Sequence, residues 1–197
     1  MTPDLFLALA GFAFVSSITP GPNNLMLMSS GANFGFRRSI PHMMGIGIGF
    51  VVMLVGVGLG AMGLFAAFPV LHLILKVLSV AYLLYLAWKI ANAAPPGQTA
   101  TKAHPITFLQ AAAFQWVNPK AWSMALTAIT VYAPDRSPQT IVLVGLIFGA
   151  VNLPSVSTWT ILGKQMRRVL GNPRALRTFN WSMAALLVAS LIPVLWP

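Results

Sequence analysis

The chain has no cysteine and very few acidic side chains. Without cysteine it can build neither a disulfide framework nor a thiolate metal site. The two carboxylates, Asp4 and Asp135, and the three histidines, His42, His72 and His104, do not stand at metal-ligand spacing. They also form no nucleophile–base pair and no acid–base dyad along the sequence. We therefore expect no catalytic centre, no bound metal and no cofactor.

Charged residues of either sign are scarce, and apolar residues predominate. Charged residues make up 7% of the 197 positions and hydrophobic residues 57%, whereas soluble domains average about 25% charged residues. Six apolar runs approach or exceed the roughly 20 residues that a helix needs to cross a bilayer. These runs cover 4–29, 40–66, 70–92, 107–132, 139–162 and 179–196. We predict one polytopic membrane domain over 1–197, with a first half at about 1–92, a cytoplasmic linker at 93–106 and a second half at 107–197.

The net charge of +10 would suggest nucleic acid in a soluble protein, but here the basic residues flank alternate ends of the apolar runs. Nine of the twelve fall on one side: Arg37, Arg38, Lys89, Lys102, Lys164, Arg167, Arg168, Arg174 and Arg177. The positive-inside rule then places loops 30–39, 93–106 and 163–178 in the cytoplasm and both termini outside. We expect no cleavable signal peptide, because Asp4 stands where positive charge is needed. The basic segment 163–179 is either an orientation signal touching anionic headgroups or an inner gate or vestibule.

Two polar interruptions divide the apolar runs in corresponding places. TPGPNN (19–24) interrupts the first run and VNPKAW (117–122) interrupts the fourth. Six spans form two sets of three, and the second set must enter the membrane from the opposite side because three is odd. Interruptions at matching places of two inverted halves indicate a central binding site in secondary transporters. We predict an all-α membrane protein with six transmembrane helices, a 3+3 inverted repeat, and breaks in the first and fourth helices.

The first interruption frees several backbone groups. Pro20 and Pro22 lack an N–H and clash with the preceding turn, and Gly21 adds conformational freedom. Such groups must face protein or water in a bilayer, so we favour a cavity-lining break over a simple proline kink. The substrate-binding candidates here are Thr19, Pro20, Gly21, Pro22, Asn23 and Asn24. The two asparagine amides suit a zwitterion, although they could instead satisfy the freed backbone.

The second interruption carries a charge inside an apolar run. Asn118 and Pro119 precede Lys120, and a lysine at a helix centre costs about 2.5–3.5 kcal/mol of insertion free energy. An intramembrane charge is by default a functional-site hypothesis. Lys120 could bind a substrate carboxylate, or it could hold a helix end or a backbone carbonyl in the break. Asn152, in the fifth run, is a weaker candidate for lining the site.

Glycines are concentrated in the second apolar run. Gly45 with Gly49, and Gly56 with Gly60, have the small-xxx-small spacing that lets two helices approach closely. We predict that they pack helices together, either within the protomer or across a homodimer.

The residues SSITPGPNNLMLMSSGANFGFRRSIPHMMGIGIGF (16–50) resemble the N-terminal signature of the LysE/RhtB family of bacterial amino-acid exporters. YLLYLAWKI (82–90) is similar to the third helix of that family, and FLQAAAFQWVNPKAW (108–122) to the fourth. The resemblance implies a six-helix inner-membrane exporter, coupled to protons, that moves amino acids or close metabolites outward by alternating access. Taken as a whole, the sequence most resembles the homoserine/threonine and cysteine/O-acetylserine exporter branches of the family. The motif positions are Pro20, Gly21, Pro22, Asn23, Asn118, Pro119 and Lys120.

One feature departs from the usual proton antiporter, which often carries an intramembrane carboxylate. Both carboxylates of this chain lie at span ends, so Lys120 or a histidine would carry the proton, or coupling would be indirect. Two alternatives to an exporter stay open. A membrane-embedded enzyme would need a His, Asp or Glu cluster at depth, and a passive channel or scaffold would need only the glycine-packed helices.

Overall fold

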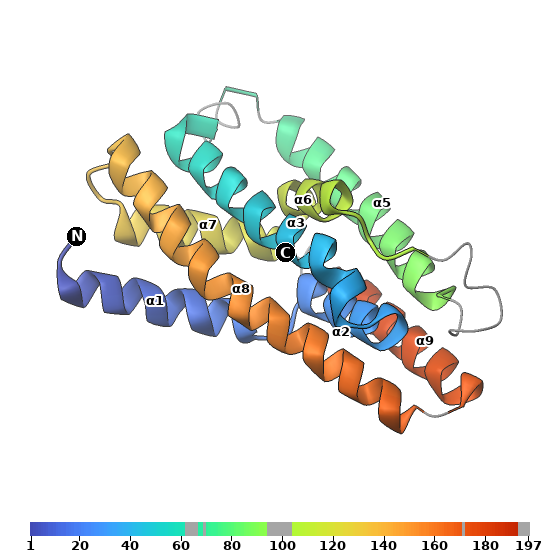
Figure 1. Ribbon diagram of the computed structural model, residues 1–197. Helices are drawn as coiled ribbons and strands as arrows, with labels where there is room; N and C mark the ends of the chain where they lie inside the picture. The colour runs from blue at the N-terminus through green and yellow to red at the C-terminus, as the bar shows by residue number, and fades with distance from the viewer. Residues whose placement is uncertain (62–66, 69, 94–103, 171, 193–197) are drawn as a thin grey trace.

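The computed structural model describes residues 1–61, 67–68, 70–93, 104–170 and 172–192, and these residues form helices without any strand (Figure 1). The helices are α1 Pro3–Ile18, α2 Pro22–Phe34, α3 Phe36–Gly56, the π-helix η1 Val57–Ala61, α5 Val70–Ala91, α6 Phe108–Val117, α7 Pro119–Tyr132, α8 Pro138–Val169 and α9 Pro173–Ala189. The all-α prediction is therefore confirmed for this part of the chain. Most of the predicted linker, 94–103, lies outside the described residues.

Prolines begin many of these helices. A proline stands at the first helical position in α1, α2, α7, α8 and α9, where its missing N–H has no intrahelical partner to lose. Side chains of Thr2, Thr107, Asn118, Ser137 and Asn172 accept hydrogen bonds from the first turns of their helices. Proline therefore marks helix starts in this protein as well as helix breaks.

Fewer helices can cross a membrane alone than the sequence predicts. Among the described residues, three are long and apolar enough, at Phe36–Gly60, Leu73–Ala91 and Pro138–Met166, and α1 with α2 makes a fourth if that bent pair is one span. The fourth and sixth predicted runs differ from prediction because α6 and α7 have only 10 and 14 residues and α9 has 17, fewer than the roughly 20 that a span needs. Six spans and a 3+3 inverted repeat stay predictions.

Two apolar clusters form the core. One joins α2, α3, α5, α6 and α9 around Leu27, Leu83 and Phe114, and the other joins α1, α3, α7 and α8 around Leu9 and Phe148. Helix α8 runs the length of the molecule past both clusters (Figure 1). The two helix breaks lie between the clusters, so the polar groups of the breaks face each other across the middle of the protein.

Glycines bring α3 against α6. A Cβ on Gly49 would lie 2.5 Å from Ala112 Cα, and a Cβ on Gly45 would overlap Phe108 O. The predicted close packing is thus confirmed within the protomer for this pair. It is wrong for Gly60, whose φ of 123° makes it a conformational glycine with open space where its Cβ would stand.

A second glycine contact brings α2 against α8. A Cβ on Gly31 would overlap the carbonyl of Thr160, and a Cβ on Gly163 would overlap the carbonyl of Met28. The two helices therefore touch through their backbones, which side chains larger than hydrogen would prevent. Neither glycine was singled out from the sequence.

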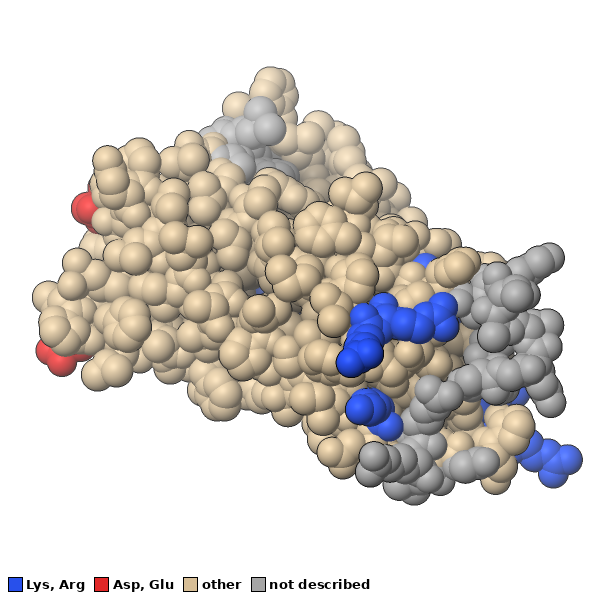
Figure 2. Space-filling view, viewed as in Figure 1, with Lys and Arg blue, Asp and Glu red and all other residues tan. Residues whose placement is uncertain are grey.

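Basic and acidic side chains gather at opposite ends of the molecule. Figure 2 shows lysine and arginine gathered at one end, and the acidic side chains at the other. Lys120, at the helix breaks, and Arg136, next to Asp135, are exceptions. Asp4 lies in the first turn of α1 and Asp135 precedes α8. At Asp135, hydroxyl groups of Ser137 and Thr140 donate to the carboxylate and lower the pKa of that group. This separation agrees with the predicted charge bias, while the side of the membrane on which each terminus lies stays a prediction.

Candidate functional site between two helix breaks

One helix ends and another begins at each of the two polar interruptions; whether each pair is one broken membrane span stays a prediction. Helix α1 ends at Ile18 and α2 begins at Pro22, with a bend of 57° between them. Helix α6 ends at Val117 and α7 begins at Pro119, leaving Asn118 between them. The Asn118 side chain accepts from the Lys120 N–H at 3.1 Å and so caps α7.

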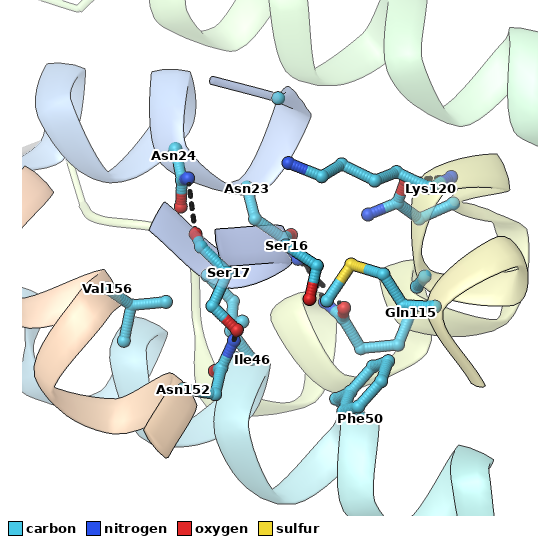
Figure 3. A pocket seen from close by; sticks show the side chains of 14 residues that line it. Ser16, Ser17, Asn23, Asn24, Ile46, Phe50, Gln115, Lys120, Asn152 and Val156 are labelled. Carbon is cyan, nitrogen blue, oxygen red and sulfur yellow. Dashed lines mark hydrogen bonds between the residues drawn. The ribbon is translucent and has the colours of Figure 1, made fainter. Parts of the chain in front are cut away.

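Lys120, whose side chain Figure 3 shows at the site, joins the two breaks. Its Nζ donates to Thr19 O at 2.8 Å, to Thr19 Oγ1 at 3.0 Å and to Pro20 O at 3.3 Å. An ammonium has three donors, so these three oxygens use all of them. The carbonyl end of a helix carries a partial negative charge, which a cation stabilises. Of the two roles considered for Lys120, this geometry is that of holding a helix end.

Other side chains satisfy the remaining carbonyls at the end of α1. Asn24 Nδ2 donates to Ser17 O and Thr19 O, each at 2.8 Å, and the Trp159 indole of α8 donates to Ile18 O at 3.0 Å. The carbonyl groups at the end of α1 thus accept hydrogen bonds from side chains of the protein. Asn24 takes the second of the roles considered for it, that of satisfying the backbone.

Asn23 reaches the second broken helix pair. Its amide and that of Gln115 in α6 exchange two hydrogen bonds, of 2.9 Å and 3.2 Å. Gln115 is fully buried and also donates to Ala111 O. Sequence reasoning missed Gln115, because a single glutamine in an apolar run has no local pattern that marks it.

Asn152 of α8 presents an unused acceptor at the site. Its Nδ2 donates to Ser17 Oγ at 3.0 Å, while its Oδ1 is buried and has no hydrogen-bond partner among the described residues. The side chain is 5% exposed. A buried acceptor without a donor costs about 1–3 kcal/mol of stability, so this oxygen is available to a water or a ligand.

A small cavity lies among these groups (Figure 3). Six predicted site residues line it, namely Gly21, Asn23, Asn24, Asn118, Lys120 and Asn152. Its volume is about 20 Å³, which is room for one water molecule. The other four candidates do not line it. Thr19 and Pro20 contact Lys120, and Pro22 and Pro119 begin α2 and α7.

His42 lies on α3, one helical turn before Ile46, which lines the cavity. The side chain is fully buried, and neither ring nitrogen has a hydrogen-bond partner in the part of the chain that the structure covers. Within the same residues, no group of three His, Cys, Asp or Glu side chains could hold a metal ion.

The sequence was compared with protein families and with known proteins. The LysE type translocator family matches residues 14–190. The chain belongs to this family. The cysteine/O-acetylserine efflux protein of Klebsiella pneumoniae is 30% identical over 95% of each chain. The proteins of the same description from Escherichia coli K12 and Shigella sonnei are 31% identical over the full length of both chains. No solved structure matches significantly.

Membership of the LysE type translocators confirms the family resemblance. Together with its apolar helices, it makes the chain a multi-pass membrane protein of a transporter family. The names of the relatives point to a transporter and not to an enzyme.

Proposed function

We propose that this LysE type translocator exports a small amino acid, or a close metabolite, from the cytoplasm across a bacterial inner membrane by alternating access. The substrate would bind in the cavity between the two helix breaks. The observation that carries the proposal is the unpaired Asn152 Oδ1 beside this cavity. The relatives supply the substrate class, because they are named for the efflux of cysteine and O-acetylserine.

The start of α2 and the Asn152 side chain suit the two charges of an amino acid. Helix α2 begins at Pro22 without a side-chain cap, so its first-turn N–H groups and its positive dipole end favour a carboxylate. The unused acceptor Asn152 Oδ1 favours the ammonium, because the carbonyls at the end of α1 already accept from protein donors. Asn23 and Asn24 would stand beside the carboxylate. We assign Lys120 the positioning of α1 and not the direct binding of substrate, since its three donors are in use.

The lining of the cavity limits which substrate can bind, and its volume requires the site to open. Its apolar lining is Ile46, Phe50, Ala121, Met124 and Val156, which suits a short side chain rather than a charged one. A volume of about 20 Å³ is too small for any amino acid, so the site must widen to load. Relative movement of the two apolar clusters on either side would open it, as alternating access requires.

The experiment that tests the function is uptake of labelled O-acetylserine and cysteine into inside-out vesicles containing the protein. Uptake in this orientation corresponds to export. We expect saturable accumulation that increases when the lumen is made acidic, because protons would leave as substrate enters. Vesicles without the protein are the control. A passive channel would only equilibrate the substrate, and failure to accumulate any of a panel of amino acids would contradict the proposal.

Asn152→Leu is expected to raise the KM for uptake about 10-fold to 100-fold, because a hydrogen bond to a charged group is worth about 1.5–3 kcal/mol. Ser17→Ala removes the same Asn152–Ser17 hydrogen bond but keeps Oδ1, so it should change the KM much less. Asn92→Leu, at the exposed end of α5, controls for the substitution itself. Equal effects of Asn152→Leu and Ser17→Ala would show that Oδ1 does not bind substrate.

A further inference from the structure

The basic end of the molecule lacks acidic side chains to neutralise it. The protein has two acidic side chains against twelve lysines and arginines, and both acids lie at the opposite end (Figure 2). Arg37 and Lys164, on α3 and α8, are exposed and make no hydrogen bond or ion pair with any residue that the structure describes. Both side chains are therefore available to pair with an anion from outside the protein.

These two side chains share a groove between the beginning of α3 and the later part of α8. The groove has a volume of about 410 Å³ and is lined by Phe36, Arg37, Ile161, Lys164 and Gln165. A guanidinium, an ammonium and an amide thus face one hollow, and all three can donate to phosphate oxygens. Phe36 and Ile161 give the same hollow an apolar wall.

The beginning of α3 adds a further source of positive potential. The helix is 21 residues long and starts at Phe36, after Gly35 with φ 77° and ψ 172°, without any side-chain cap. The N–H groups of its first turn have no intrahelical acceptor and no side-chain cap among the described residues, so they can bind an anion, which the helix dipole favours there. Phe36 and Arg37 belong to this first turn, so the start of α3 and the two cationic side chains lie at the same groove.

We propose that this groove binds the headgroup phosphate of an anionic phospholipid. Arg37, Lys164 and the first turn of α3 would bind the phosphodiester, while Ile161 would contact an acyl chain. The neighbouring apolar surface of α8 supports a lipid rather than a soluble phosphate, because Ile161 and Leu162 are 42% and 46% exposed and continue the apolar wall. Anionic lipid is abundant in the cytoplasmic leaflet, to which the positive-inside rule assigns this end.

The test is lipid retention by the purified protein. After equilibration with vesicles of equal parts phosphatidylglycerol and phosphatidylcholine, wild-type protein should retain phosphatidylglycerol at least fivefold over phosphatidylcholine, measured by mass spectrometry. The double variant R37Q/K164Q should lose this enrichment. The control R174Q/R177Q changes the same amount of charge at exposed positions of α9 and should keep it. If the double variant does not give a monodisperse protein, the single variants R37Q and K164Q are measured instead. Each should lose part of the phosphatidylglycerol enrichment.

Three outcomes would overturn the proposal. Equal loss in the two double variants would mean attraction to surface charge in general. No enrichment in wild-type protein would mean that no anionic lipid is preferred. Displacement of the lipid by millimolar glycerol 3-phosphate would mean that the groove binds a soluble phosphate instead of a lipid.

Discussion

Lys120→Ala is expected to abolish export, with a loss of at least about 100-fold in uptake rate, while the protein still inserts in the membrane. The ammonium makes three hydrogen bonds to Thr19 and Pro20, and hydrogen bonds to charged groups are worth about 1.5–3 kcal/mol each. Without them the end of α1 and the start of α2 are no longer held in place beside the cavity. Insertion should not suffer, because Lys120 stands in the first turn of α7 within an apolar segment, and replacing a charge there by alanine makes insertion more favourable.

Vesicle uptake and the amount of inserted protein are the two measurements for Lys120→Ala. Lys76→Ala is the matched control, since Lys76 lies on α5, away from both breaks. Methylammonium, which supplies a cation of similar chemistry, should restore part of the activity of the Lys120 variant and leave the control unchanged. Unaltered uptake by the Lys120 variant would remove this residue from the mechanism.

Gly31→Val is expected to prevent accumulation of folded protein. The new side chain would meet the Thr160 carbonyl of α8, and a backbone carbonyl cannot yield as a flexible side chain can. Overpacking costs about 1–3 kcal/mol even when side chains can adjust, so we expect Gly31→Val to lower the free energy of unfolding by about 3 kcal/mol or more. The readouts are the yield of monodisperse protein by size-exclusion chromatography and its thermal midpoint.

Gly11→Val provides the comparison for the α2–α8 contact. Gly11 is also helical, but no atom lies within 4 Å of where its Cβ would stand. This variant should retain the wild-type yield and midpoint. Gly163→Val, on the other side of the same contact, should repeat the loss seen for Gly31→Val. Normal folding of both contact variants would mean that the two helices can separate without penalty.

The helix ends at the two interruptions follow from residues that act locally. A proline disfavours continuation of a helix from the preceding turn, and α2 and α7 begin at Pro22 and Pro119. Proline alone does not decide this, because Pro41 and Pro154 lie inside α3 and α8. The polar candidates near the breaks were found for the same reason, since each stands out against an apolar run. Whether they bind substrate stays a prediction.

Partners that depend on three-dimensional packing were missed. Gln115 meets Asn23 across 92 positions of the chain, and Asn33 exchanges amide hydrogen bonds of 2.7 Å and 3.0 Å with Asn180 across 147 positions. Single amides in apolar runs carry no periodic signal that pairs them. Trp159 likewise donates to a carbonyl of α1. The residues next to Trp159 in the sequence do not indicate this contact.

Helix α8 is unbroken over its 32 residues and carries Asn152 and Lys164 twelve positions apart, which is about 18 Å along a helix. Pro154 lies inside the helix between these two residues and leaves one backbone hydrogen bond unmade, so the helix connects them through a point at which it can bend. If the proposed groove holds Lys164 at the bilayer surface, a change of tilt there would shift the Asn152 amide through this hinge, and the lipid composition of the host membrane would then influence how readily the translocator loads its substrate.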